Sequence, residues 1–450
     1  MTRSAGYLEL LRGNRDYRRL WIGDMASLLG DWFNTIALYT LIRQLTGSPV
    51  ALGLVFIVKT LPFALASPLA GLLADRFDRK RLMIGADVAR AVVVLGFLAV
   101  DRAAELPLLY GLIALQMMIG AVFTPARSAS LPNITTPREL LTANALSAAT
   151  WSVLLAVGAA LGGFATEGLG TGTVFMLDSA SYLISAVFVA GVRIPPLDAA
   201  DEPAPDRPAA MALHIGRRLA ESWRQAHDEI VDGWRQLTRR PEIGRMALVK
   251  PIWAVGGGAL VYALTLVGES WRPGAPAVGI GLLFAARGLG TGIGPIAARA
   301  GVPERHWPTM FGLGLVMTGL AYMTVGWMAW GLWLPLLVVV AHAPSGANWV
   351  ASTVLLQKRT PDRYRGRVFA TEWLLITLID SAAILAVSVL LQTAAVTLRQ
   401  AILAFAALEI AGGIAWLAAV VPPEKRLQAA EPAEAPTEVG VGVQGQGTPR

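Results

Sequence analysis

The sequence predicts an all-α membrane protein, with twelve transmembrane helices in two pseudo-symmetric bundles of six. Its composition is the first reason: 54% of the 450 residues are hydrophobic and 15% are charged, with a mean hydropathy of +0.53. Soluble domains carry about 25% charged residues. The second reason is a series of long apolar runs, since a helix needs about 20 apolar residues to cross a bilayer core of about 30 Å. Third, these runs are too long and too uniformly apolar to be barrel strands, which alternate.

Twelve runs of this kind follow one another along the chain. They cover residues 20–42, 49–73, 82–100, 106–126, 141–166, 173–193, 245–267, 277–299, 308–328, 331–355, 368–391 and 398–421. If the N-terminus is cytoplasmic, thirty of the 38 Lys and Arg residues fall in cytoplasmic segments and four in external loops. Because Lys and Arg accumulate in cytoplasmic loops, we expect a multi-pass protein of a bacterial-type cytoplasmic membrane with both termini in the cytoplasm. The net charge of +7 then reflects topology and does not indicate a nucleic-acid partner.

Several kinds of chemistry are not indicated by the sequence. It contains no Cys, and its four His residues are widely spaced and form no HExxH motif or metal-ligand cluster. A phosphate-binding P-loop is also missing. The stretch Gly292 to Ala297 fits a dinucleotide-binding GxGxxA pattern, but it lies inside an apolar run with no strand before it, which favours close helix packing. We therefore expect no enzyme activity, no cofactor and no metal.

An internal repeat relates the two halves of the chain at a shift of about 226 residues. The segment SPVALGLVF from Ser48 resembles APAVGIGLLF from Ala275, which pairs Lys59 with Arg287. Likewise SASLPNITTP from Ser128 resembles STVLLQKRTP from Ser352. Two six-helix repeats are typical of transporters whose binding site lies between the halves near the membrane midplane, with alternating access.

The repeat divides the chain into four predicted segments. They are an N-terminal six-helix bundle (1–195), a cytoplasmic linker (196–242), a C-terminal six-helix bundle (243–422) and a disordered cytoplasmic tail (423–450). Within the linker, apolar residues recur every three or four positions over 213–237, which predicts an amphipathic helix along the inner membrane surface or under the bundle. The tail is rich in Ala, Gly, Pro and Glu, a composition typical of disorder.

The loop between the second and third runs, GLLADRFDRKRLM (71–83), resembles the signature loop of the major facilitator superfamily. Asp78 replaces the usual second glycine of that signature. The resemblance implies a gating loop in which Asp75 attracts the positive end of a helix in the opposite half. The matching positions that we assign to gating are Gly71, Asp75, Arg76, Arg79 and Lys80. The alternative is a solvated turn that only sets topology.

A second group of segments resembles the drug/proton antiporter branch of that family, which includes macrolide-efflux proteins and the enterobactin exporter. It comprises NRDYRRLW (14–21), Gly-Asp-Trp (30–32), TGSPVALGL (46–54), the stretch 123–151 and WRQLTRRPEIGR (234–245). The helix-5 motif of antiporters occurs here without its proline (Gly158 to Gly163), and Gln116 stands near the helix-4 position where some drug antiporters carry arginine. The resemblance implies a monomeric exporter of drug-like or natural-product molecules coupled to protons, although the helix-5 motif does not mark the coupling.

Ionisable residues inside the apolar runs are candidates for the transport site, because a charge in hydrocarbon is unfavourable unless it is paired or hydrated. Asp31, Lys59, Arg287, Asp380 and Glu409 lie near the middle of their runs. Asp31 is the first choice for a proton carrier. Lys59 and Arg287 occupy equivalent positions and are expected near the substrate path, as partners of Asp31 and Asp380. For the two aspartates, a static buried ion pair that fixes helix packing is the alternative.

Other charges lie near the cytoplasmic ends of the runs, where they suggest gates. Asp87 and Arg90 share a helix face at a spacing of three and are expected to form a structural pair. Asp24 and Lys250 are equivalent in the repeat; a pair between them would close the inner gate, unless the helix ends lie too far apart. Glu372 suits either a gate or a helix N-terminal charge.

Three tryptophans lie in runs expected to face the cavity: Trp32, Trp253 and Trp349. They would suit a large apolar or amphipathic compound, and a cationic one in view of the acidic groups, although Trp also concentrates at membrane interfaces. The predicted function is therefore export of small molecules by a secondary transporter, with substrate, protons and membrane lipid as partners. The alternatives are an importer of a narrow substrate and a sensor or scaffold built on a transporter fold.

Overall fold

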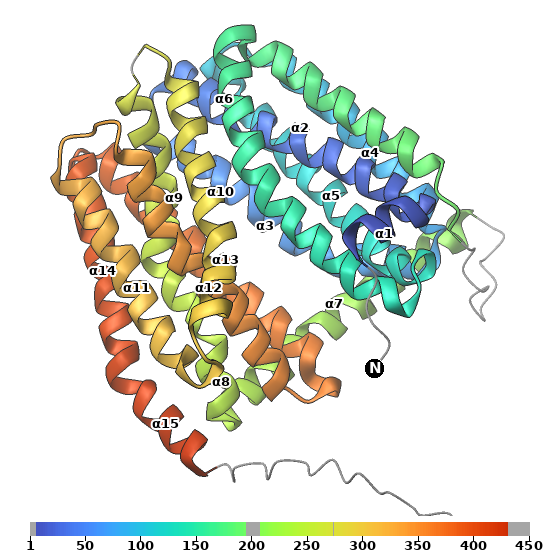
Figure 1. Cartoon of the computed structure of the whole chain (residues 1–450). Coiled ribbons are helices and arrows are strands. Elements are labelled where there is room, and N and C mark those ends of the chain that lie inside the picture. The colour runs from blue at the N-terminus through green and yellow to red at the C-terminus, as the bar shows by residue number, and fades with distance from the viewer. Residues whose placement is uncertain (1–5, 195–207, 273, 431–450) are drawn as a thin grey trace, which may run out of the picture.

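The computed structural model describes residues 6–194, 208–272 and 274–430, apart from the side chains of 68, 72, 75, 76, 208–220, 222 and 430 (Figure 1). The regular elements of these residues are helices. Those of the first half are α1 (Tyr7–Gly13), α2 (Arg15–Thr46), α3 (Pro49–Arg76), α4 (Arg79–Leu95), η1 (Gly96–Ala99), η2 (Ala103–Glu105), α5 (Leu106–Ile134) and α6 (Pro137–Ala190). The rest are α7 (Pro208–Arg239), α8 (Pro241–Ala247), α9 (Val249–Trp271), α10 (Pro276–Gly301), η3 (Glu304–His306), α11 (Trp307–Trp327), α12 (Leu334–Arg359), α13 (Asp362–Gln392), α14 (Leu398–Ala419) and α15 (Val421–Ala430).

Helix α6 contains both the fifth and the sixth apolar run and reverses direction between them. The reversal is at Gly170, whose φ of +79° and ψ of 159° lie outside the helical region and suit a residue without Cβ. The first part runs beside the start of α2, where the Trp21 indole donates to the Thr150 hydroxyl over 2.9 Å. The second part returns to the same place, where the Arg193 backbone N–H donates to Asp16 over 3.0 Å. Figure 1 shows the two parts of α6 diverging from their turn, with α2 between them.

Ten of the described helices are long and apolar enough to cross a membrane. The ten include α6 as one element of 54 residues and leave out α2. Polar residues at the centre of α2, Asp31 and Asn34 among them, lower its hydropathy. An all-helical membrane fold is therefore confirmed, and the number of twelve crossings stays a prediction that requires α2 to cross once and α6 twice.

Equivalent helices make equivalent contacts in the two halves. In the first half α3 packs against α5 and α4 against α6; in the second half α10 packs against α12 and α11 against α14. Between the halves, α6 packs against α10, and α3 packs against α13 (Figure 1). This arrangement agrees with a duplicated unit, whose exact boundaries at 195 and 243 stay predictions.

The halves are joined at one end of the molecule, which we call the closed end; it carries the loops 47–48, 274–275 and 393–397. The polar contacts there are Arg43–Glu269 (2.8 Å), Tyr262 hydroxyl to Pro49 carbonyl (2.8 Å), Ser48–Gln392 (2.7 Å) and Ala277 N–H to Glu167 (3.1 Å). Small residues bring the backbones together, since a Cβ on Gly163 would lie 2.6 Å from the Ala277 carbonyl oxygen. Two ring contacts also join the halves on this side, between Tyr39 and Phe284 and between Phe56 and Tyr262.

Helix α7 lies at the opposite end, the linker end, and crosses beneath the bundles (Figure 1). The helix predicted over 213–237 is thus present and packs under the bundle, against α13 and α8. Asp232 pairs with Arg367 of α13 at 2.9 Å, and the Thr371 hydroxyl donates to the Ile230 carbonyl over 3.2 Å. Gly233 allows this contact, because a Cβ there would overlap Thr371.

The first residues of the tail predicted over 423–450 are helical in the structure. Residues 423–430 belong to α15, and residues 431–450 lie outside the described part of the chain. The buried Glu424 accounts for the ordered segment, since its carboxylate binds both Arg245 and Arg359. Composition alone missed this ion-pair cluster, because its arginines lie far away in the sequence.

Candidate functional site

Asp31 lies near the middle of α2 and takes part in a buried hydrogen-bond chain. The Tyr182 hydroxyl of α6 donates to its carboxylate. Gln116 of α5, fully buried, donates in turn to the Tyr182 oxygen over 3.0 Å. The guanidinium of Arg90 lies 4.3 Å from the centre of the Tyr182 ring. Residues of four helices thus meet around one partly buried carboxyl group.

Lys59 of α3 reaches the same region but does not pair with the carboxylate of Asp31. Its ammonium donates to the Thr35 hydroxyl over 2.7 Å, and that hydroxyl donates to the Asp31 backbone carbonyl over 2.6 Å. The expected direct partnership is therefore replaced by a hydroxyl bridge. Lys59 still acts electrostatically on Asp31, and both residues are half-buried.

Asp87 and Arg90 form the predicted pair on α4. The pair is buried, and one Asp87 oxygen and the Arg90 Nε have no hydrogen-bond partner. Asp24 and Lys250 do not meet in this conformation, so the inner gate between them stays a prediction. Asp24 pairs with Arg127 of α5 at 2.7 Å, and Lys250 pairs within its own half. Each of the two charges thus has its ion-pair partner in its own bundle.

The partner of Lys250 is Glu372 of α13, whose two oxygens lie 3.0 and 3.1 Å from the ammonium. Aromatic rings surround this pair. The Lys250 ammonium lies 5.1 Å from the Trp349 ring centre, and Trp349 makes edge-to-face contacts with both Trp253 (6.3 Å) and Trp373 (6.2 Å). Trp349 and Trp373 stay partly open to the surroundings. An aromatic wall beside a carboxylate can bind an organic cation.

Arg287 and Asp380 interact electrostatically without a direct ion pair in the described structure. Asp380 packs against Gly258 of α9, where a Cβ would overlap its carboxylate. Nearby, the Tyr322 hydroxyl and His342 Nε2 are 2.8 Å apart in a fully buried contact. Arg287 thus faces a polar cluster in the second half, as Lys59 does in the first, which agrees with their equivalence in the repeat.

Trp32 does not join the aromatic wall. It packs against Gly158 of α6, and its indole nitrogen is buried without a hydrogen-bond partner. The next glycine of the helix-5 motif, Gly162, lies against Phe33, while Gly163 faces α10 of the opposite half. The glycine motif without proline is therefore the place where α2, α6 and α10 cross.

The signature loop makes its described contacts inside its own half. Arg79 donates to the Ala129 carbonyl over 2.9 Å, and its Nε lies 3.4 Å from the Ala74 carbonyl. Gly71 has open space around it, so close helix approach is not its role in this conformation. Lys80 is partly buried. The side chains of Asp75 and Arg76 lie outside the described set.

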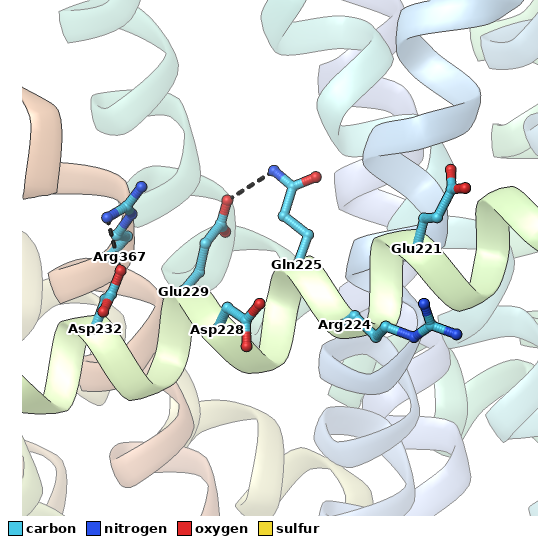
Figure 2. A pocket seen from close by; sticks show the side chains of 7 residues that line it. All are labelled: Glu221, Arg224, Gln225, Asp228, Glu229, Asp232 and Arg367. Carbon is cyan, nitrogen blue, oxygen red and sulfur yellow. Dashed lines mark hydrogen bonds and ion pairs between the residues drawn. The ribbon is translucent and has the colours of Figure 1, made fainter.

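A surface cavity of about 340 Å³ lies between α7 and α13 and shares no residue with these charged clusters. Figure 2 shows Glu221, Gln225 and Glu229 on one side of α7, with Asp232 meeting Arg367 at one end. The predicted helix therefore presents an acidic row at the linker end. Among the described residues, no group of three or more His, Asp or Glu side chains is arranged to hold a metal ion.

Sequence reasoning missed Asp178, which is 0% exposed on α6. It accepts a hydrogen bond from Asn34 over 2.6 Å, one turn along α2 from Asp31. The signal was present, because Asp178 is an ionisable residue inside an apolar run and meets the criterion that selected Asp31.

Comparison with known proteins gives three kinds of similarity. The family model of the Major Facilitator Superfamily matches residues 20–378. Macrolide efflux protein A of Streptococcus pyogenes is 31% identical over 182 residues, 40% of this chain and 44% of that protein. The putative bacilysin exporter BacE of Bacillus amyloliquefaciens is 30% identical over 188 residues, 42% of this chain and 46% of that protein. The aligned part thus spans less than half of these relatives.

Longer matches are more distant. The MFS-type transporter y4rN of Sinorhizobium fredii is 26% identical over 384 residues, 82% of this chain and 87% of that protein. The solved structure of a peptide transporter POT in complex with sulfate superimposes with a TM-score of 0.68 at 14% identity, over 92% of this chain and 96% of that one. At such low identity the structural likeness supports the fold alone. Since the family model covers most of the sequence and both bundles, the chain belongs to the Major Facilitator Superfamily.

Proposed function

We propose that this transporter exports drug-like or natural-product small molecules in exchange for protons, by alternating access. The observation that carries the proposal is the position of Asp31, a carboxyl group at the centre of α2 that contacts Tyr182 and lies near Lys59 and Arg90. A carboxyl group held between hydrogen-bond donors and cations in a membrane interior changes its proton occupancy when its surroundings rearrange. Rearrangement of the two halves would supply that change.

The proposed orientation places the linker end in the cytoplasm, as the distribution of Lys and Arg predicts. The closed end would then face outward, and the conformation described would admit substrate from the cytoplasm. Export requires the opposite conformation as well, in which the contacts of Arg43, Gly163 and Tyr262 open and the linker end closes. In that state Asp24 and Lys250 would approach each other, and the signature loop would contact the second half.

The proposed substrate class is large, amphipathic and cationic. Its binding surface would be the aromatic wall of Trp253, Trp349 and Trp373, with Glu372 as the countercharge. A cationic compound would compete with Lys250 for both the carboxylate and the ring face of Trp349. The efflux relatives named above support the export of small molecules. Their own substrates are not assigned to this chain.

The test uses everted membrane vesicles from a bacterium that lacks its own drug pumps, energised with a respiratory substrate. Cationic dyes and macrolides are added, and both their accumulation and the decrease of the pH gradient are recorded. We expect compound-dependent proton release in the wild type and its loss in Asp31→Asn. The matched control is Asp101→Asn, in an exposed loop, which should behave as the wild type.

Three other outcomes of the vesicle assay would change the proposal. Proton release that persists in Asp31→Asn would move the coupling site to Asp380 or Glu409. Accumulation in right-side-out vesicles but not in everted ones would indicate an importer. No response to any compound, with the protein present in the membrane, would contradict broad drug export and would favour a single dedicated substrate or a sensor.

A further inference from the structure

The interior of the first half contains one more carboxyl group than cations. Around the middle of α2, α3, α4 and α6 lie three carboxyl groups and two cations: Asp31, Asp87, Asp178, Lys59 and Arg90. Arg90 pairs with Asp87, and Lys59 lies nearest to Asp31 through the Thr35 hydroxyl. Asp178 is left without a cation within ion-pair distance in the described structure. A buried ionised carboxylate without such a partner is strongly disfavoured. Burial therefore favours the protonated, neutral form of Asp178.

The surroundings of Asp178 suit a protonated carboxyl group. Its side chain is 0% exposed. One oxygen accepts from the Asn34 amide over 2.6 Å, and the other lies 3.5 Å from the Ser181 hydroxyl. The amide oxygen of Asn34 is also fully buried and has no donor in the structure. A neutral carboxyl group can both donate and accept, so a proton on Asp178 would add a donor beside the Asn34 amide.

Asp178 and Asp31 lie close enough to influence each other's charge. Asn34 binds Asp178 and Asp31 binds Tyr182, so the two carboxyl groups sit one helical turn apart along the contact between α2 and α6. The groups that act on Asp178 electrostatically are Asp31 from α2, Lys59 from α3 and Arg90 from α4. When two carboxyl groups interact strongly, they lose their protons in two steps. Each step is then a property of the pair and not of one residue.

We propose that Asp31 and Asp178 form one coupled proton-binding site, in which Asp178 holds the proton in the conformation described. Binding of a cation near Asp31, or removal of Lys59 from it, then changes the proton occupancy of the pair as a whole. This inference adds a second proton-binding residue to the proposed antiport. Only the role of the pair in transport rests on the proposed function. The proton on Asp178 can be measured without any substrate.

The second half contains a comparable group, which supplies an internal comparison. Glu409 of α14 is buried, and its carboxyl oxygens have no side-chain partner in the described structure. It packs against Gly256 of α9, while Asp178 packs against Gly30 of α2. The two glycines are related by the shift of the internal repeat. Among the residues that the structure describes, no second carboxyl group acts on Glu409 as Asp31 acts on Asp178, so the coupling belongs to the first half.

The experiment is infrared spectroscopy of the full-length protein in lipid nanodiscs near neutral pH, comparing the wild type with Asp178→Asn. Loss of one carbonyl band of a protonated carboxyl group in the variant is the expected result. The matched control, Asp101→Asn, removes an exposed residue and should lose only carboxylate bands. If Asp178→Asn also loses carboxylate bands and no carbonyl band, Asp178 is ionised and the proposal is overturned.

Coupling is tested by titrating the Asp178 carbonyl band in Asp31→Asn. The pH at which the band disappears should differ from the wild type, whereas it should stay unchanged in Asp101→Asn. An unchanged pH in Asp31→Asn would show independent groups and overturn the coupled site. If Asp178→Asn does not fold, Asn34→Ala keeps both carboxyl groups and should shift the band by removing its hydrogen-bond partner; an unshifted band would assign it to another residue.

The vesicle assay separates the two proposals. If the infrared results are as expected but Asp31→Asn still releases protons during transport, the proton-binding pair stands and the antiport through Asp31 fails. If transport depends on Asp31 while Asp178 is ionised, the antiport stands and the coupled pair fails.

Discussion

The ion pair between Lys250 and Glu372 allows a quantitative test of how burial sets the strength of a charge pair in this protein. Both side chains are nearly inaccessible, at 5% and 3% exposure, and both carboxylate oxygens bind the ammonium. Replacing Lys250 by Met removes the cation and leaves Glu372 buried without a partner. We expect this single change to destabilise the folded protein strongly, because the remaining carboxylate cannot reach water.

The magnitude follows from the contacts. Hydrogen bonds to charged groups contribute about 1.5–3 kcal/mol each, so two of them give about 3–6 kcal/mol. Breaking a buried ion pair from one side costs about 3–5 kcal/mol in general, which agrees. The double variant Lys250→Met with Glu372→Leu removes both charges and should recover most of the loss. The expected coupling energy between the two sites is therefore above about 2 kcal/mol.

Lys358 and Glu304 are the matched control. Their ammonium and carboxylate oxygens lie 2.8 and 2.6 Å apart, so the geometry is at least as good. The side chains are 56% and 46% exposed, however, and water can replace each lost contact. The same pair of substitutions there should give a coupling energy below about 1 kcal/mol.

The assay is unfolding in mixed lipid and detergent micelles, followed by tryptophan fluorescence, for the wild type, the single variants and the double variants of both pairs. Equal coupling energies at the two pairs would refute the view that burial sets the strength. A coupling below about 0.5 kcal/mol at the buried pair would show that Lys250 and Glu372 act independently, contrary to the described contacts.

Three further predictions concern the contacts between helices. Gly281→Val places a side chain against the Ala159 carbonyl, so we expect the closed conformation of that end to be disfavoured by about 1–3 kcal/mol and transport to fall. The measurement is the labelling of single cysteines introduced at the closed end, since the natural sequence contains no cysteine. Gly233→Val should detach α7 from α13 and increase protease cleavage of the linker; unchanged cleavage would argue against docking of α7. Arg43→Gln breaks the partly exposed pair with Glu269 and should lower the stability of the closed end by no more than about 1 kcal/mol. A large change in cysteine labelling there would show that this pair holds the closed end more strongly than its exposure suggests.

Much of the fold could be predicted from the sequence because membrane helices are specified locally. The length and apolar composition of each run determine whether it crosses hydrocarbon, and neither depends on its neighbours. The pair between Asp87 and Arg90 was predictable for the same reason, since a spacing of three places both residues on one helix face. The amphipathic helix in the linker also follows from local periodicity.

The candidate site was predictable only in part. The buried charge of Asp31 is visible in the sequence as an ionisable residue in an apolar run, and so is that of Asp178. Their hydrogen-bond partners are not, because Asn34 and Tyr182 are unremarkable polar residues until α2 and α6 are placed side by side.

Local sequence specifies the membrane-embedded helices, the duplicated plan and the residues that must be paired or protonated in the interior. The partners of those residues depend on how the helices pack in three dimensions. Asp24 binds Arg127 and Lys250 binds Glu372, although the repeat relates Asp24 to Lys250. The physical reason is that electrostatic attraction depends on distances in space, and these are set by which helices pack together and by the end at which the two halves are closed.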